Sequence, residues 1–205
     1  MSYQLSRLRV SYIVLSVVVL LTGSGCSSPH YAVDFNLTDS SFKSKGKSIA
    51  VISGSKEPMS VALAKMVSDS LGKKSRYLVA SQANVSKAVE SYPQTIKGPY
   101  KSAYFYIDQD WDMGDRKKIA DIQRSLGVDY LYVIWAPIAV SQNGYSVSNV
   151  RAIAQLFEQP NAKVVAQSTM GLLAGDEKNL YFKEGADEIA RLLAEETNMA
   201  IAVKK

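Results

Sequence analysis

The chain contains one cysteine and one histidine among its 205 residues. Cys26 therefore has no partner for an internal disulfide. His30 lies four residues after Cys26, close to the beginning of the chain, and cannot serve a distant active site. Ser-His-Asp and Cys-His catalysis are excluded on this ground, and so are the usual histidine-based zinc sites. The sequence predicts no catalytic residue, no metal site and no cofactor.

The chain also has no dense block of basic residues and no glycine-rich phosphate loop. Ser53-Gly54-Ser55 lacks the lysine and the later glycines of a nucleotide-binding loop. The formal net charge of +5 falls to +3 once Arg7 and Arg9 leave with the amino-terminal leader, so nothing predicts nucleic-acid binding. The short cluster at residues 43–47 is interpreted as a solvated linker, with contact to anionic lipid headgroups as the alternative.

The amino end has the layout of a secretory signal. Arg7 and Arg9 form a short basic region, and residues 10–21 form an apolar run that is too short for a comfortable membrane span. Small residues then lead to Ser24-Gly25 directly before Cys26, while Gly23 stands where leucine is usual. This layout resembles a bacterial lipoprotein lipobox, which implies cleavage between Gly25 and Cys26 and lipidation of the cysteine.

The lipobox interpretation divides the chain into three parts. Residues 1–25 are a lipoprotein signal peptide, 26–47 a flexible tether from lipidated Cys26, and 48–205 a single periplasmic α/β domain. Each buried acyl CH₂ contributes roughly 0.8 kcal/mol to membrane retention. At roughly 3.3 Å per residue the tether would reach up to ~70 Å from the bilayer. Ser27, which is not aspartate, implies sorting to the outer membrane. An ordinary cleaved signal and an uncleaved anchor helix are the alternatives.

Hydrophobic patterning predicts alternating strands and helices in the first half of the domain. Apolar residues 48–53 indicate a buried strand, and Pro58 fits the first turn of a helix that ends at Gly72. Residues 76–80 are predicted to form a second strand, and Asn84 to cap a short helix.

The middle of the chain is predicted to be a loop followed by a helix and a central strand. Residues 103–107 are read as a short strand or as an aromatic loop that packs on the domain. Asp112 or Asp115 should cap a helix that Gly127 ends. The β-branched and aromatic residues 129–135 predict a central strand, which Pro137 should break.

The carboxy-terminal part is predicted to be a hairpin and a helix. Residues 146–169 should form an antiparallel hairpin around the turn Gln159-Pro-Asn161, and a helix should follow from about 180 to 199. The predicted fold class is α/β (α+β): two layers, with helices packed on a mixed sheet that ends in an antiparallel meander.

The segment Leu126-Gly-Val-Asp-Tyr-Leu-Tyr-Val133, with a strand pair and tight turn before Val164-Val165, carries a family resemblance. It is similar to a lipoprotein superfamily that includes the curli secretion channel lipoprotein, the penicillin-binding-protein activator LpoB and the amino-terminal domain of TolB. The resemblance covers about residues 48–200. It implies an anticodon-binding-domain-like fold, as in the TolB amino-terminal domain, and a non-catalytic envelope lipoprotein that works by protein contacts.

An aromatic-rich stretch provides the candidate contact surface. Tyrosine and tryptophan are favoured at interfaces because they bury area while keeping a polar group. The loop at 98–113 is therefore interpreted as a partner-binding loop, with Tyr100, Tyr104, Tyr106 and Trp111 as its contact residues. The alternative is that these aromatic rings fold back over the sheet. The acidic residues 108–115 are interpreted as a helix-capping loop, with a degenerate calcium loop as the alternative.

The sequence thus predicts a lipid-anchored, non-catalytic protein at the outer membrane, facing the periplasm. Its partners would be the bilayer, through acylated Cys26, and one or more envelope proteins of unknown identity. It would act as a binding, assembly or regulatory module for a machine of cell-wall synthesis, polysaccharide export or secretion. The alternative is a subunit of an oligomeric outer-membrane secretion channel, and homo-oligomerisation is left open. An envelope hydrolase is the third hypothesis, disfavoured because no nucleophile–base pair is evident.

Overall fold

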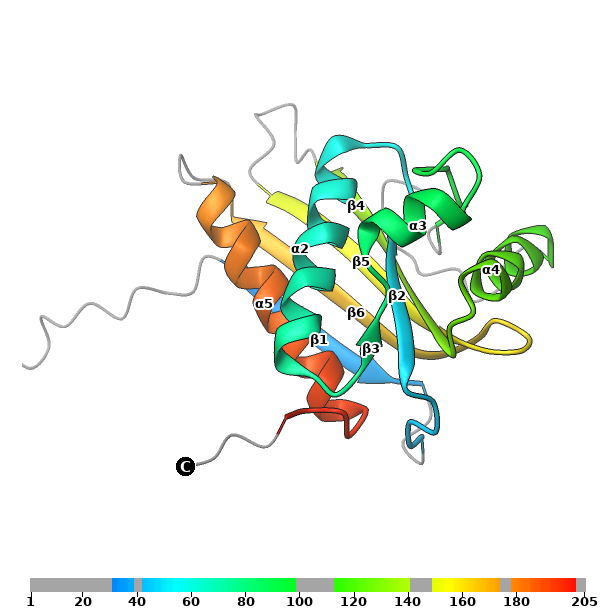
Figure 1. Ribbon diagram of the computed structural model, residues 1–205. Helices are drawn as coiled ribbons and strands as arrows, with labels where there is room; N and C mark the ends of the chain where they lie inside the picture. The colour runs from blue at the N-terminus through cyan, green and yellow to red at the C-terminus, as the bar shows by residue number, and fades with distance from the viewer. Residues whose placement is uncertain (1–30, 39–41, 99–112, 141–148, 174–177, 202–205) are drawn as a thin grey trace, which may run out of the picture. The chain divides into compact units, whose positions relative to one another are not determined.

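Six strands form one mixed sheet in the order β1-β6-β5-β4-β2-β3 (Figure 1). The computed structural model describes residues 31–38, 42–98, 113–140, 149–173 and 178–201. The predicted strand or loop at 103–107 lies outside these ranges.

The parallel half of the sheet is built by β2, β3 and β4. Strand β2 (Ser48–Ser53) is the predicted first strand, and Ile49 to Ile52 are fully buried. It pairs in parallel with β4 (Tyr130–Val140) on one side and with the short edge strand β3 (Leu78–Val79) on the other. A β-branched run buried on both faces is typical of a strand in this position.

The antiparallel half contains the predicted hairpin. Strands β5 (Asn149–Glu158) and β6 (Lys163–Leu173) pair across the predicted turn, and β5 also pairs with β4. The expected break at Pro137 is wrong, because β4 continues to Val140. The register shifts between Trp135 and Ile138, so the proline stands at an irregularity where a missing N–H costs no ladder bond.

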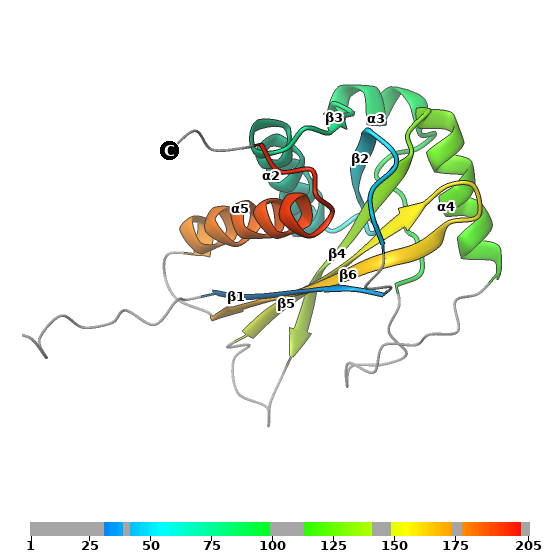
Figure 2. The same ribbon diagram turned by 90° about the horizontal axis from the view of Figure 1, so that it is seen from below.

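Helices α2 and α5 lie side by side over one face of the sheet (Figures 1 and 2). Helix α2 (Pro58–Lys74) begins with the predicted proline but runs through Gly72, so the predicted stop is wrong. A single helix-interior glycine costs about 1 kcal/mol, which the buried face of α2 outweighs. Helix α5 (Lys178–Glu196) buries the five residues that its spacing predicted: Phe182, Ala186, Ile189, Ala190 and Leu193.

Helices α3 (Gln82–Ala88) and α4 (Met113–Leu126) cover the opposite face beside β2 and β4. Ser81, and not Asn84, caps α3, because the Ser81 side chain accepts a hydrogen bond from the Asn84 backbone N–H. Helix α4 ends at the predicted place, where Gly127 has a positive φ of 63°.

Strand β4 separates two hydrophobic cores. Tyr130, Tyr132 and Ile134 point to the core under α2 and α5, whereas Leu131, Val133 and Trp135 point to the core under α3 and α4. The α+β class with helices on a mixed sheet is confirmed. Beyond what the pattern predicted, helices stand on both faces of β2 and β4.

The predicted tether at 26–47 is wrong over much of its length. Residues Tyr31–Leu37 form β1, an edge strand paired antiparallel with β6. Its odd-numbered residues pack on the core with α5, and its even-numbered residues are exposed. This period-two alternation is present in the sequence and could have predicted the strand. Residues 44–47 are also held, through bonds to Tyr77, Tyr130 and Asp129.

Candidate functional site

The site residues that the sequence predicted lie outside the described ranges. Gly25 and Cys26 precede Tyr31, and the aromatic residues of the candidate partner-binding loop fall within 99–112. The structure describes the chain on either side of that loop, up to Gly98 and again from Met113.

The two ends of the candidate partner-binding loop are tied to each other. The Lys97 backbone N–H donates to Asp115 Oδ1 at 3.4 Å, and Lys118 Nζ donates to the Thr95 carbonyl at 2.7 Å. Asp115 is in the first turn of α4, where its charge also complements the helix dipole. Both bonds join the chain before residue 99 to the helix that begins at Met113.

A groove of about 490 Å³ lies between α3 and α4 beside this place. Its lining is of mixed polarity: the side chains of Val89 and Ile122 are apolar and buried, and those of Glu90, Lys118 and Asp121 are charged. It is lined by Ala88, Val89, Glu90, Ser91, Gln94, Lys118, Asp121, Ile122 and Ser125. A shallow surface of mixed polarity suits contact with a peptide or protein segment. No sequence pattern indicated this groove, because it arises from the packing of two helices.

The carboxyl end of β2 is the usual ligand-binding position of a parallel sheet. Here it holds two buried serines. Ser53 Oγ lies 2.8 Å from Ser60 Oγ and 2.6 Å from the Ser55 carbonyl, and Ser60 Oγ donates to the Ile134 carbonyl at 3.0 Å. These hydroxyls connect β2, α2 and β4. Their hydrogen bonds in the described chain go to backbone groups and to each other.

The polar side chains around Ser53 also form hydrogen bonds to the backbone. Tyr92 Oη accepts from the Ser53 N–H at 3.1 Å, and burial raises the pKa of Tyr92. Gln82 Nε2 donates to the Val51 carbonyl at 2.9 Å. Trp135 Nε1 donates to the Ile96 carbonyl at 2.9 Å. This end of the sheet is therefore a junction of hydrogen bonds that joins β2, α2, β4 and the segment around Ile96.

A second junction holds the opposite end of β2. Asp129 Oδ2 accepts from the Lys47 N–H at 2.8 Å and from the Ser48 hydroxyl at 2.7 Å, while the Asp129 N–H donates to Ser48 Oγ at 2.9 Å. Hydrogen bonding from Ser48 lowers the pKa of Asp129. Tyr130 Oη accepts from the backbone of Lys45 and Gly46. The lysines of this segment are exposed.

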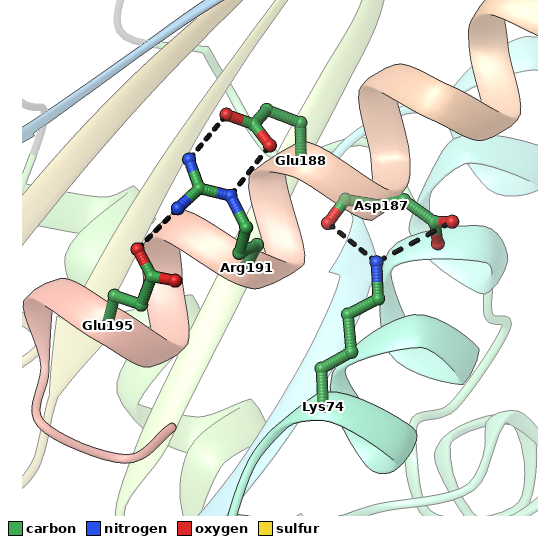
Figure 3. A network of polar contacts seen from close by, with 5 residues as sticks. All are labelled: Lys74, Asp187, Glu188, Arg191 and Glu195. Carbon is green, nitrogen blue, oxygen red and sulfur yellow. Dashed lines mark hydrogen bonds and ion pairs between the residues drawn. The ribbon is translucent and has the colours of Figure 1, made fainter. Parts of the chain in front are cut away.

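One surface ion pair joins α2 to α5, and two more lie within α5 (Figure 3). Lys74 Nζ on α2 lies 3.6 Å from Asp187 Oδ2 on α5. Arg191 donates from two nitrogens to Glu188, and these hydrogen bonds lower the pKa of Glu188. Arg191 also contacts Glu195. These pairs are partly exposed to solvent and contribute little stability each. They are typical of a helix pair that faces water.

The described residues contain neither a helix suited to span a membrane nor a cluster of metal-ligating side chains. None of the helices among residues 31–38, 42–98, 113–140, 149–173 and 178–201 combines the length and the apolarity that crossing a membrane requires. Within the same ranges, no three histidine, cysteine, aspartate or glutamate side chains come together as metal ligands would.

The chain was compared with known proteins. No protein-family model matches it, and no curated protein matches it significantly. Solved structures do match. A PelC dodecamer from Paraburkholderia phytofirmans aligns at a TM-score of 0.43 and 10% identity, over 80% of this chain and 97% of that one. Lipoprotein GNA1162 from Neisseria meningitidis aligns at a TM-score of 0.41 and 16% identity, over 72% of this chain and 98% of that one.

Both matched proteins are distant neighbours, and similarity at this level assigns no function to this chain. The superfamily of the curli channel lipoprotein, LpoB and TolB is not among the matches reported above, so that membership stays a prediction. The candidate functional surface is accordingly defined by this chain's own residues: the groove between α3 and α4 and the two bonded ends of the loop at 99–112.

Proposed function

We propose that this protein is a lipid-anchored, non-catalytic module of the bacterial envelope. Acylated Cys26 holds it at the outer membrane, and its domain faces the periplasm. There it binds an envelope protein and assists the assembly or regulation of the machine to which that protein belongs. Cell-wall synthesis, polysaccharide export and secretion are the candidate processes.

The observation that carries the proposal is the position of the lone cysteine. Cys26 follows an apolar run and small residues, and the first strand of the folded domain begins at Tyr31, five residues later. The chain therefore passes from a cleavable leader to a folded domain with a single thiol at the junction. We infer that the Cys26 thiol is lipidated, because acyl chains retain a water-exposed domain at a bilayer.

The partner surface is inferred from the candidate functional surface. The groove between α3 and α4 is lined by both apolar and charged side chains. The aromatic loop at 99–112 starts and ends beside it, since Lys97 and Asp115 are bonded. Tyrosine and tryptophan are among the residues that dominate protein interfaces, and we therefore assign the aromatic residues of the candidate partner-binding loop to the partner contact.

The non-catalytic assignment is supported by the polar groups that the sheet positions. Ser53 and Ser60, the buried hydroxyls at the carboxyl end of β2, bond to backbone carbonyls and to each other. A hydrolase would need a base within hydrogen-bond reach of such a hydroxyl. The chain's single histidine, His30, precedes the first strand.

Mass spectrometry of the mature amino terminus tests the anchor. We expect a diacylglyceryl-modified and N-acylated Cys26 in the native protein, recovered in the outer-membrane fraction. Cys26→Ser should release the domain into the soluble fraction, and Ser27→Ala, a matched change that leaves the thiol, should not. An unmodified terminus on a membrane-associated native protein would contradict the proposal.

Crosslinking tests the partner surface. A photo-reactive amino acid at Lys118 in the groove should capture an envelope protein in intact cells, whereas the same residue at Lys65, on the outer surface of α2, should not. Capture of the same protein from both positions, or from neither, would contradict a specific surface at the groove. The captured protein would name the machine.

A further inference from the structure

Strand β1 is the longer of the two open edges of the sheet. The strand order places β1 at one end and β3 at the other, and no strand of the described chain pairs with the outer side of either. Edge strands are commonly protected by shortness, lysine, proline or a bulge. Strand β3 is two residues long, whereas β1 has seven residues, no lysine, no proline and no register shift against β6. The edge at β1 can therefore accept another strand.

The backbone groups on the outer edge of β1 come from its odd-numbered residues. The Thr38 N–H donates to the Val165 carbonyl at 3.0 Å, which extends the β1–β6 register by one position. In an antiparallel pair, successive residues direct their N–H and C=O groups alternately toward the partner strand and away from it. Even-numbered residues of β1 therefore bond to β6, and the N–H and C=O groups of Val33, Phe35 and Leu37 point to the open edge.

The side chains of these odd-numbered residues form a half-covered apolar row. Tyr31, Val33, Phe35 and Leu37 pack against the core under α2 and α5, and each is partly exposed. Helix α5 covers this face of β1 (Figure 2). The residues on the other face are exposed, and Asp34 is the one charge of the strand. A strand added at the open edge would cover more of the apolar row if its own residues alternate in the same way.

The sequence of β1 is complementary to itself. In an antiparallel pair of two copies with Phe35 opposite Phe35, Val33 lies opposite Leu37 and Asp34 lies opposite Asn36. The apolar residues then meet on one face of the joined sheet. On the other face, an amide that can donate a hydrogen bond lies opposite the carboxylate.

The neighbouring registers are less favourable. A pair centred on Asp34 sets two carboxylates opposite each other, and like charges in this position repel. A pair centred on Val33 sets Leu37 opposite Pro29, which has no N–H to donate. The opposite shift, to a pair centred on Asn36, leaves fewer residues of β1 paired. Charge, proline position and length thus favour the same register.

We infer that two copies of this protein pair through β1, antiparallel and centred on Phe35, and so join their sheets into one. The outward groups of Val33, Phe35 and Leu37 form about six backbone hydrogen bonds in this pair, two for each opposed pair of residues. The dimer has two-fold symmetry, the commonest symmetry of homo-oligomers. It goes beyond the proposed function, because it requires neither the lipid anchor nor the groove between α3 and α4.

A proline at an outward position tests the pairing. Val33→Pro removes an N–H that does not bond to β6, and proline is tolerated on an edge strand at such a position. Val33→Ala is the matched control, since it also shortens the side chain but keeps the N–H. Size-exclusion chromatography with light scattering, corrected for detergent, measures the mass of each lipidated protein. We expect the native protein and Val33→Ala to be dimers and Val33→Pro to be a monomer.

Circular dichroism and urea unfolding show whether Val33→Pro is folded. A folded Val33→Pro protein that is still a dimer would overturn the pairing, and so would a native protein that is a monomer at every concentration tested. A monomeric native protein leaves the proposed function intact. A dimeric native protein without acyl groups refutes the proposed anchor and supports the pairing.

Disulfide trapping tests the register, and it decides the question if Val33→Pro does not fold. Cys26→Ser removes the native thiol, so an introduced cysteine is the only one in the chain. Full-length Asp34→Cys and Asn36→Cys proteins with different tags are mixed and treated with a mild oxidant. The two exposed positions are directly opposite in the inferred pair, so the mixed disulfide should form in preference to either homodimer.

Lys65→Cys, at an exposed position on α2, is the control for random collision. Mixed disulfide no more abundant than the Lys65→Cys dimer would overturn the pairing. A dominant Asp34→Cys homodimer would overturn the register centred on Phe35, because it requires the two Asp34 positions to lie opposite each other.

Discussion

At the scale of single residues, Gly54 shows how closely the chain packs where β2 ends. A Cβ atom at position 54 would lie 2.2 Å from Trp135 Nε1, which is closer than any real contact of this kind. The indole is fixed, because its N–H donates to the Ile96 carbonyl and Ile96 N–H donates to the Gly54 carbonyl. Gly54 provides the space that the indole of Trp135 occupies.

Gly54→Ala should therefore destabilise the protein by about 2 kcal/mol, the usual cost of overpacking a core. Gly72→Ala is the matched control. Gly72 is inside α2 with open space around it, so alanine there should stabilise by about 0.8 kcal/mol. Urea unfolding followed by circular dichroism measures both. Equal effects of the two substitutions would contradict the packing described at Trp135.

Asp129 provides a prediction about pH. Its pKa is lowered from the ordinary 3.8, chiefly by hydrogen bonds from Ser48. In the unfolded chain the carboxylate takes up a proton first as the pH falls. The stability it provides is therefore complete above the unfolded pKa and is lost as the pH falls from there through the lower folded pKa.

Asp129→Asn should lower the free energy of unfolding at pH 7 by about 1 kcal/mol, a modest value because the carboxylate is largely exposed. The difference from the native protein should shrink below pH 4. Unfolding titrations at pH 7, 5 and 3 measure it, with Asp69→Asn as the control for loss of an exposed carboxylate. A deficit that stays constant down to pH 3 would rule out the proposed linkage.

At the scale of elements, β1 shows what sequence patterning misses. The alternation of apolar and polar residues from Tyr31 to Leu37 is present in the sequence, but a Ser/Lys-rich context favoured a tether. The strand exists because β6 and α5, more than 120 residues away, provide its partner and its cover. Ser81 and Asn84 both suit a cap, and the structure shows that the Ser81 side chain accepts the bond from the Asn84 N–H at the start of α3.

Phe35→Ala tests β1 directly. The Phe35 side chain packs against the core beneath α5, so its loss should cost about 2 kcal/mol, less than for a fully buried phenylalanine. Asn36→Ala is the matched control on the exposed side of the same strand and should change stability by less than about 0.5 kcal/mol. Chemical unfolding of the two variants provides the comparison. If neither substitution matters, residues 31–37 behave as the tether that the sequence first indicated.

At the scale of the whole molecule, the placement of β5 and β6 bears on the alternative of a secretion channel. The hairpin that would have to span the membrane in a channel is in the middle of the sheet, between β4 and β1. Its residues Ala154, Leu156 and Ala166 are buried in the core under α2 and α5. Removing it to line a pore would expose that core.

We therefore expect the detergent-extracted protein to be a monomer or a small oligomer. Size-exclusion chromatography with light scattering, corrected for bound detergent, measures its mass. A large ring of many copies would favour the channel subunit over the binding module. Cys26→Ser protein, purified without detergent, is the control for association caused by the acyl chains alone.

The sequence by itself determined the features that depend on neighbouring residues. Periodicity within one segment gave β2, the hairpin, both long helices and the α+β class, and the order of small residues before Cys26 gave the lipoprotein hypothesis. The candidate partner-binding loop and Cys26 lie outside the described residues and stay predictions.

Tertiary structure alone decided the features that depend on distant segments. Strand β1, the continuation of β4 past Pro137, the second layer of helices and the groove between α3 and α4 each require partners far apart in the chain. A proline in a strand or a glycine in a helix is locally unfavourable. Burial of apolar surface between distant segments compensates for that cost, and no single segment can provide it alone.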